Sequence, residues 1–212
     1  MDLENIFDKI NITSGDKILV HSSILKILIK LKKKNKKFNA NLIIDSLINK
    51  VGPKGTIIFA TYNWEFCNGK VFDYNKSQSM AGSMGSFALK RKDFRRTKNP
   101  IYSFAVTGKD KDYLCNLNHN NCFDLDSPFG YLIKNHGKNL FIGIDYKDGF
   151  TLSHIAEQAV GINYRYLKDF SGFYASRPRL PQGILGQLGP GGKYRAGQRA
   201  GHRRPRLALR RL

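Results

Sequence analysis

The sequence predicts an α/β protein, a layered α-β-α sandwich around a central mixed sheet that is incomplete at its C-terminus. Three observations support this prediction. Short apolar runs typical of buried strands alternate with segments of helical periodicity. A chain of 212 residues with 41% hydrophobic content can bury one core. The composition also changes near residue 175, which divides the chain into a folded domain, 1–174, and a basic tail rich in Arg, Gly and Pro, 175–212.

The first half of the domain is predicted to contain helix, strand, helix, helix and strand in that order. Apolar residues at helical spacing predict an amphipathic helix over 2–11, and a Ser-Gly-Asp turn leads into a strand over 17–20. A helix is expected from Ser23, and the lysine-rich segment 32–37 interrupts it. The remaining elements are a helix over 40–50 and a strand over 56–60. Two strands joined through helices predict a right-handed crossover.

The second half adds strands over 103–107 and 140–144, with a helix over 128–134 between them. A polar loop, 145–150, then leads into a further helix start. Helices that alternate with short strands predict a sheet covered on both faces, which binds ligands at the C-terminal ends of its strands. His21, Thr61 and the loop before His154 all lie at such ends.

The net charge of +20 is divided evenly between the domain and the tail. Residues 1–176 hold 26 of the 36 Lys+Arg and all 16 Asp+Glu, so 10 basic and no acidic residues remain in 177–212. The tail is arginine-rich where the domain is lysine-rich, and we hypothesise that it is not native to this fold. Its composition predicts disorder. Its arginine clusters would bind polyanions such as RNA or DNA through salt-sensitive, non-specific contacts.

Cysteine usage and hydropathy limit the class of protein. Cys67, Cys115 and Cys122 are odd in number and lack a C-x-x-C spacing, which indicates reduced thiols and argues against a zinc site. No apolar run approaches the ~20 residues that cross a bilayer, and the N-terminus lacks the basic and apolar regions of a secretory signal. We therefore expect a cytoplasmic protein without a metal or a membrane partner.

The segment from Thr151 to Glu157 is the most suggestive of chemistry. His154 and Glu157 are three residues apart, so on a helix they share one face. The carboxylate can then orient the imidazole while the second ring nitrogen accepts a proton, which is the geometry of a general base. The alternative is that His154 is a packed or capping residue, a more common role for a histidine near a helix start.

A second segment, His21-Ser22-Ser23, follows the predicted strand 17–20, and a helix that begins there presents free backbone N–H groups to an anion. Further motifs follow along residues 15–160: Val-Gly-Pro-Lys-Gly-Thr at 51–56, Ala-Thr-Tyr at 60–62, Met-Gly at 84–85, Arg96 with Pro100 and Ser103-Phe104, Ser-Pro at 127–128, and Thr151, His154 and Glu157. In this order, the motifs resemble those of the aminoglycoside 3-N-acetyltransferase family.

The resemblance implies acetyl transfer from acetyl-CoA to a primary amine of an aminoglycoside or amino sugar, the chemistry of antibiotic-resistance enzymes of this kind. It implies that His154 accepts the proton of the attacking amine and that Glu157, or Asp148 in the preceding loop, orients it. Thr61 would donate to the developing oxyanion. The residues expected to hold the pantetheine or phosphates of the coenzyme are His21, Ser22, Ser23 and Ser103.

Some positions leave two interpretations open. Tyr62 and Trp64 are packing residues or, together with Asp148, part of the acceptor pocket, because aromatic faces suit sugar rings and cations. The lysine-rich segment 32–37 is a solvated loop or attracts the coenzyme phosphates. The chain also departs from the family pattern. It has Asn99-Pro100-Ile101-Tyr102-Ser103 where the family has His-Pro-x-His-Ser, and Leu89 and Lys90 stand near the position of an acid usual after Met-Gly.

Two other classes of function compete with the active enzyme. Family members extend further after the histidine-bearing helix, so the first alternative is a truncated, catalytically inactive product that retains coenzyme binding. Its open sheet edge would favour instability, aggregation or a homo-oligomer. The second is a nucleic-acid-binding module led by the arginine-rich tail.

Overall fold

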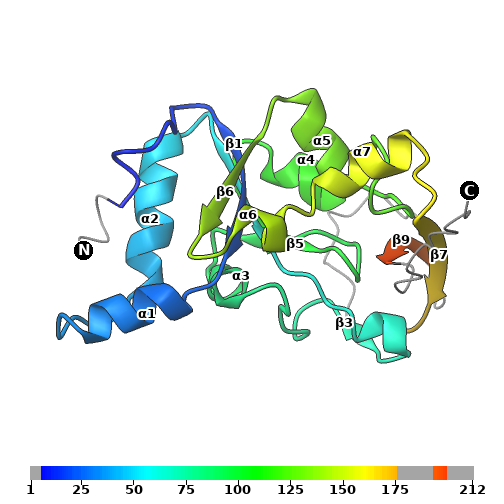
Figure 1. Cartoon of the computed structure of the whole chain (residues 1–212), viewed down its shortest axis with the longest axis horizontal. Coiled ribbons are helices and arrows are strands. Elements are labelled where there is room, and N and C mark those ends of the chain that lie inside the picture. The colour runs from blue at the N-terminus through cyan, green and yellow to red at the C-terminus, as the bar shows by residue number, and fades with distance from the viewer. Residues whose placement is uncertain (1–5, 176–192, 200–212) are drawn as a thin grey trace, which may run out of the picture.

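A central mixed sheet confirms the predicted α/β class in the computed structural model, which describes residues 6–175 and the backbone of 193–199 (Figure 1). The strand order is β4-β5-β2-β1-β6. β1 pairs in parallel with β2 and with β6, so the C-terminal ends of these three strands meet at one edge of the sheet. β5 pairs antiparallel with both β2 and β4. The strands are β1 (Lys17–Ser22), β2 (Thr56–Ala60), β4 (Arg95–Arg96), β5 (Phe104–Gly108) and β6 (Lys138–Ile142).

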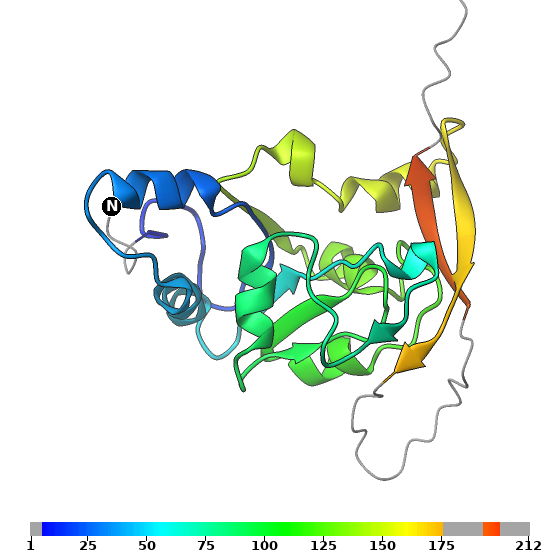
Figure 2. The same ribbon diagram turned by 90° about the horizontal axis from the view of Figure 1, so that it is seen from below.

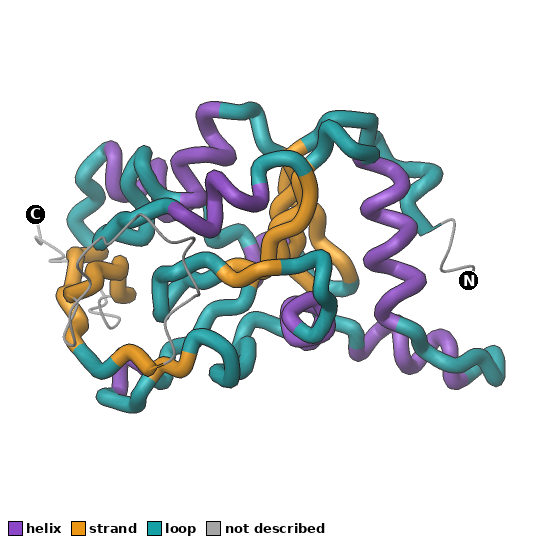
Figure 3. The backbone as a smooth tube through the Cα atoms, turned by 180° about the vertical axis from the view of Figure 1, so that it is seen from behind, coloured by secondary structure: helices purple, strands orange, loops and turns teal. Residues whose placement is uncertain are grey.

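Helices cover both faces of this sheet, and each face has its own hydrophobic core. In β2, Ile57 and Phe59 belong to one core while Ile58 and Ala60 belong to the other, as expected when successive side chains alternate across a sheet. One face packs against α1 (Leu25–Lys32), α2 (Ala40–Val51) and α3 (Ser83–Leu89). The other packs against α4 (Lys111–Asn116), α5 (Pro128–Lys134) and α7 (Ser153–Ala159). From behind, the strands lie between these two groups of helices (Figure 3).

Most predicted elements are found at or near the expected residues. α2, β2 and α5 match their predicted ranges to within one residue. β6 begins and ends two residues before the predicted strand 140–144. It stops there because Gly143 adopts a φ of +67° and approaches the backbone of Ser23 so closely that a Cβ would lie 2.3 Å from its carbonyl oxygen.

The predicted helix over 2–11 is wrong where the structure describes it. Residues 6–10 form turns, with the Ile10 N–H bonded to the Phe7 carbonyl at 3.3 Å. Phe7 is 3% exposed in the core on the α1, α2 and α3 face, so one anchoring side chain satisfies the apolar pattern without a helix. A segment this short does not sustain a helix through periodicity alone.

Beyond α7 the chain forms further strands outside the main sheet. β7 (Arg165–Ser171) pairs antiparallel with β9 (Lys193–Arg199), and Figure 2 shows the two side by side. β8 (Tyr174–Ala175) pairs in parallel with β3 (Phe72–Asp73). The disorder of the tail stays a prediction. The rest of the predicted tail beyond residue 175, including the arginine clusters proposed to bind polyanions, lies outside the described residues.

Two short helical segments, η1 (Phe66–Asn68) and α6 (Tyr146–Gly149), complete the elements. The three cysteines are free, with Cys115 and Cys122 buried. No helix in the described part of the chain has both the length and the apolar character that a membrane span requires.

Candidate active site

The predicted pair His154 and Glu157 forms on α7 as the spacing required. His154 Nδ1 lies 2.7 Å from Glu157 Oε2, and each side chain is 21% exposed. The neighbouring Ile155 is buried in the core and fixes the face that α7 presents. The imidazole also packs edge-to-face on Phe123, with ring centroids 5.2 Å apart. The histidine is thus held in one orientation while its side chain stays accessible.

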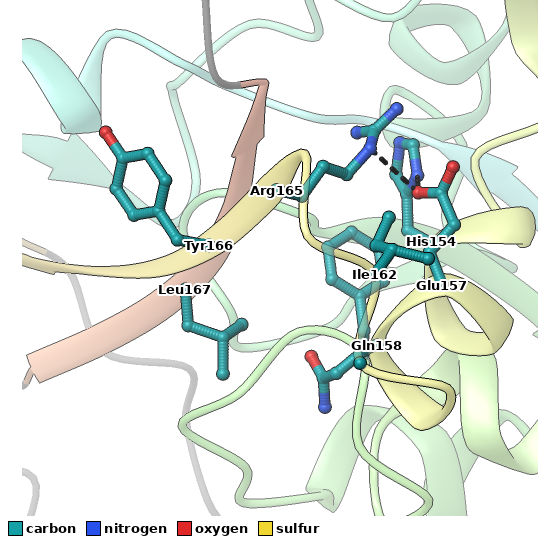
Figure 4. A pocket seen from close by; sticks show the side chains of 9 residues that line it. His154, Glu157, Gln158, Ile162, Arg165, Tyr166 and Leu167 are labelled. Carbon is teal, nitrogen blue, oxygen red and sulfur yellow. Dashed lines mark hydrogen bonds and ion pairs between the residues drawn. The ribbon is translucent and has the colours of Figure 1, made fainter.

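Glu157 links α7 to the start of β7 through an ion pair with Arg165 and a hydrogen bond from Tyr164. Arg165 Nε lies 2.9 Å from Oε2, the oxygen that contacts His154, and the Tyr164 hydroxyl donates to Oε1 at 3.3 Å. His154, Glu157 and Arg165 line a pocket of about 200 Å³ and are shown together in Figure 4. Phe123, Ile162 and Leu167 contribute apolar surface to the same pocket.

A larger pocket, of about 620 Å³, lies at the edge where the parallel strands end. The apolar side chains of Leu25 and Leu28 on α1 form part of its wall. The predicted coenzyme and acceptor residues that line it are His21, Ser22, Ser23, Tyr62, Trp64 and Asp148. The sequence-based expectation that ligand-binding residues gather at the strand ends therefore agrees with where this pocket lies.

His21 is the most unusual polar group of the larger pocket. Its side chain is 5% exposed and stacks on Phe141, with ring centroids 5.5 Å apart. Burial lowers the pKa of His21 from 6.5 to about 4, so the ring is neutral at pH 7. Among the residues that the structure describes, none forms a hydrogen bond with Nε2. A buried ring nitrogen without a partner is expected to meet one from a ligand or water.

Two glycines hold the backbone around the end of β1. Gly82 and Gly143 both have positive φ, at +99° and +67°. A Cβ at either position would lie 2.3 Å from a carbonyl oxygen, that of Ser22 for Gly82 and that of Ser23 for Gly143. No larger residue fits at either position without moving the segment that lines the pocket.

Tyr62, Trp64 and Asp148 differ in how far they reach into the larger pocket. Tyr62 is 2% exposed and packs edge-to-face on Tyr102, with centroids 4.7 Å apart, and burial raises the pKa of its hydroxyl. Trp64 is 40% exposed, so its ring is available to a ligand. Asp148 lines the larger pocket and does not line the pocket of His154. Glu157, and not Asp148, is therefore the carboxylate that orients His154.

Thr61 and Ser103 require a correction. Both side chains are 0% exposed, and their hydroxyl oxygens lie 2.9 Å apart. The Ser103 hydroxyl is also 2.8 Å from the Thr61 carbonyl oxygen, to which it donates. The two residues tie the end of β2 to the chain before β5 and present neither hydroxyl to a pocket. The structure thus does not place Thr61 as an oxyanion donor or Ser103 as a coenzyme contact.

The loop that departs from the family pattern is also engaged internally. Asn99 Oδ1 accepts hydrogen bonds from the backbone N–H groups of Ile101 and Tyr102, both at 3.0 Å. Asn99 therefore holds the backbone of this loop through its side-chain oxygen.

Sequence reasoning missed Arg165 and Phe123. Arg165 is the first residue of β7, and it meets Glu157 because the turn after α7 brings the start of β7 close to the helix, a contact that no local pattern indicates. One signal was available, since the first 176 residues contain 22 lysines and only 4 arginines, of which Arg165 is one. Within the described ranges, no cluster of three or more His, Cys, Asp or Glu side chains could hold a metal ion.

Comparisons with solved structures show the same fold. AAC-IIIb in its binary complex with CoASH has a TM-score of 0.69 and 19% sequence identity, and the match covers 93% of this chain and 74% of that one. The YokD protein from Bacillus subtilis has a TM-score of 0.69 and 21% sequence identity, and the match covers 92% of this chain and 80% of that one. AAC-VIa with sisomicin bound has a TM-score of 0.64 and 21% sequence identity, and the match covers 92% of this chain and 73% of that one.

A comparison with curated proteins found no match. The family model described as aminoglycoside 3-N-acetyltransferase matches residues 19–179, which include both pockets and the His154 and Glu157 pair. This match covers most of the sequence, and the chain belongs to the aminoglycoside 3-N-acetyltransferase family.

Proposed function

We propose that this protein is an N-acetyltransferase that transfers the acetyl group of acetyl-CoA to a primary amine of an amino sugar or aminoglycoside. Family membership supports acyl transfer. The related structures that contain CoASH and sisomicin support the two substrate classes. The observation that carries the proposal is the 2.7 Å contact between His154 and Glu157 on the wall of a pocket.

His154 is proposed as the general base. Only a neutral amine has the lone pair that attacks a thioester carbonyl, so a proton must leave the nitrogen as it reacts. Glu157 Oε2 binds Nδ1, which directs the second ring nitrogen to that proton. The negative charge of Glu157 then stabilises the imidazolium ion that forms. The new C–N bond replaces the C–S bond, and the proton passes from the amine to His154 and on to the departing thiolate.

We propose the larger pocket as the coenzyme site. It offers apolar surface from α1 for the pantetheine arm and the backbone N–H groups at the start of this eight-residue helix, whose N-cap makes no side-chain hydrogen bond. The buried Nε2 of His21 supplies a hydrogen-bonding group that the described residues leave unsatisfied. We propose that His21, Ser22 and Ser23 hold the coenzyme there. Acetyl-CoA supplies the activated acyl group.

The two pockets are adjacent in the chain. Thr151 lines the larger pocket and His154 the smaller one, and the His154 N–H donates to the Thr151 carbonyl at 3.1 Å. The turn 151–154 therefore joins the proposed coenzyme side to the proposed acceptor side. The acetyl group must reach His154 across this turn for transfer to occur.

The test is release of free thiol from acetyl-CoA in the presence of a panel of amino sugars and aminoglycosides. His154→Ala should lower kcat/KM by about 10²–10⁴-fold because general-base catalysis is lost. His136→Ala is the matched control, since His136 is exposed and lies outside both pockets. Thermal unfolding of both variants shows whether the fold is retained.

The outcomes separate the proposed enzyme from its alternative. Full activity in a folded His154→Ala variant would remove the base assignment. Thermal stabilisation by acetyl-CoA without thiol release from any amine would identify a coenzyme-binding protein that has no transferase activity.

A further inference from the structure

The smaller pocket has a charge pattern that restricts the acceptor. Among the described residues that line it, Glu157 is the only carboxylate. Its Oε2 contacts His154 Nδ1 and Arg165 Nε, and its Oε1 accepts from the Tyr164 hydroxyl. Both oxygens are therefore engaged within the protein. An ammonium group entering this pocket would meet no carboxylate that is available to bind it.

Arg165 places a permanent positive charge in the same pocket. Its side chain is 17% exposed, and the ion pair with Glu157 uses Nε. Figure 4 shows the guanidinium beside His154 and Glu157. Because the ion pair uses Nε, the two terminal amino groups remain as further N–H donors of the same charged group. Apolar walls from Phe123, Ile162 and Leu167 lower the local dielectric, which strengthens the interaction of that charge with a ligand.

The sequences of the paired strands β7 and β9 contain more basic than acidic residues. β7 carries Arg165, Lys168 and Asp169, and its partner β9 carries Lys193, Arg195 and Arg199. Arg199 stands opposite Arg165 in the register of the two strands. Residues 177–212 contain no Asp or Glu, so none of them can supply the carboxylates that a polycation would need.

We infer that the acceptor is an amino sugar whose scaffold carries an anionic group, phosphate or carboxylate, and that Arg165 binds this group while His154 faces the amine. The inference rests on the proposed function and specifies its acceptor. A guanidinium binds phosphate and carboxylate through paired N–H donors. Because Arg165 and His154 contact the same carboxylate oxygen, the amine and the anion must belong to one compact molecule, as in a monosaccharide.

The experiment compares four acceptors in the thiol-release assay. Glucosamine 6-phosphate carries a phosphate, 2-amino-2-deoxyglucuronate carries a carboxylate, glucosamine has an uncharged scaffold and sisomicin is a polycation. For the unaltered chain, kcat/KM should be highest for one of the two anionic sugars, which identifies the anion, and lowest for sisomicin.

Arg165→Gln tests the residue itself. It should lower the ratio of kcat/KM for the preferred anionic sugar to that for glucosamine by about tenfold, mainly through KM. Lys134→Gln is the matched control because it removes a positive charge from an exposed position at the end of α5, outside both pockets, and should leave that ratio unchanged. An equal loss for all acceptors in Arg165→Gln would show a purely structural role and overturn the inference.

Calorimetric binding of glucosamine 6-phosphate separates this inference from the proposed function, because binding needs no turnover. Binding that weakens about tenfold in Arg165→Gln, without thiol release, would support the anion site and reject the transferase. Preferred turnover of sisomicin would support the transferase and reject the anion site.

Discussion

Replacing Glu157 by Gln tests the central contact of the site with little change in shape. The amide can still accept from His154 Nδ1, which now lies 2.7 Å from Oε2, but the negative charge is lost. A hydrogen bond to a charged group contributes about 1.5–3 kcal/mol, which corresponds to roughly 10- to 150-fold in rate. Both side chains are 21% exposed, so solvent weakens the interaction and the lower part of that range, about 10- to 50-fold, is expected.

The assay is kcat/KM for thiol release with the best acceptor, measured beside thermal unfolding. Glu65→Gln is the matched control, since it makes the same chemical change at a residue outside both pockets. A Glu157→Gln variant that keeps its stability and stays within about twofold of the unaltered kcat/KM would refute the reasoning, because the carboxylate charge would then contribute nothing to the transition state.

Three further changes test the fold and the pockets. Thr61→Val should cost about 1–2 kcal/mol of stability through loss of the contact with Ser103, and a loss of about 10²-fold or more in kcat at retained stability would restore Thr61 as an oxyanion donor. Burial lowers the pKa of His21 from 6.5 to about 4, so the unfolded chain binds more protons between these values and stability falls as the pH drops through them. This difference in pKa corresponds to about 3 kcal/mol of stability. In urea unfolding, His21→Gln should therefore lose less stability than the unaltered chain between pH 7 and pH 4. Equal losses would contradict a lowered pKa of His21. Gly143→Ala should destabilise by more than ~3 kcal/mol because it adds a clash with the Ser23 carbonyl to the strain of a positive φ. Gly69→Ala, also at positive φ but with open space around its Cβ, should cost only the strain, about 1–2 kcal/mol; similar losses for both in chemical denaturation would count against a clash.

Local patterns predicted the parts of the fold that depend on local physics. The apolar run in β2 is predicted as a strand, and its alternate side chains enter two different cores. The helices α2 and α5 were predicted at their observed positions, where Asn39 and Ser127 cap them. The end of β6 was misplaced because the close approach of Gly143 to Ser23 is a contact between distant segments. The turns at residues 6–10 likewise reflect the docking of Phe7 in the core, which periodicity does not report.

In the candidate site, too, contacts within one helix could be predicted from the sequence, whereas contacts between separate elements could not. The contact between His154 and Glu157 could be predicted because it is set by the geometry of one helix. The orientation of Thr61 could not, because a residue just past a strand end points to the core or to the pocket according to its neighbours. Arg165 was missed for a similar reason, since its contact with Glu157 depends on the path of the chain between α7 and β7.

The two pockets also differ in how freely substitutions can change them. Around the proposed coenzyme pocket, the backbone at Ser22 and Ser23 is fixed by close contacts with Gly82 and Gly143, so most changes there disturb the sheet edge. The proposed acceptor pocket is lined mainly by residues of α7, β7 and the turn between them, together with Phe123, and the side chains of Tyr166 and Leu167 are exposed. Substitutions on this side can change the charge of the pocket without moving the strands. An arginine paired with Glu157 therefore changes which acceptor is preferred, while the coenzyme pocket and His154 stay the same. For this reason the decisive measurement for Arg165 is the ratio of kcat/KM between acceptors, and not the total activity.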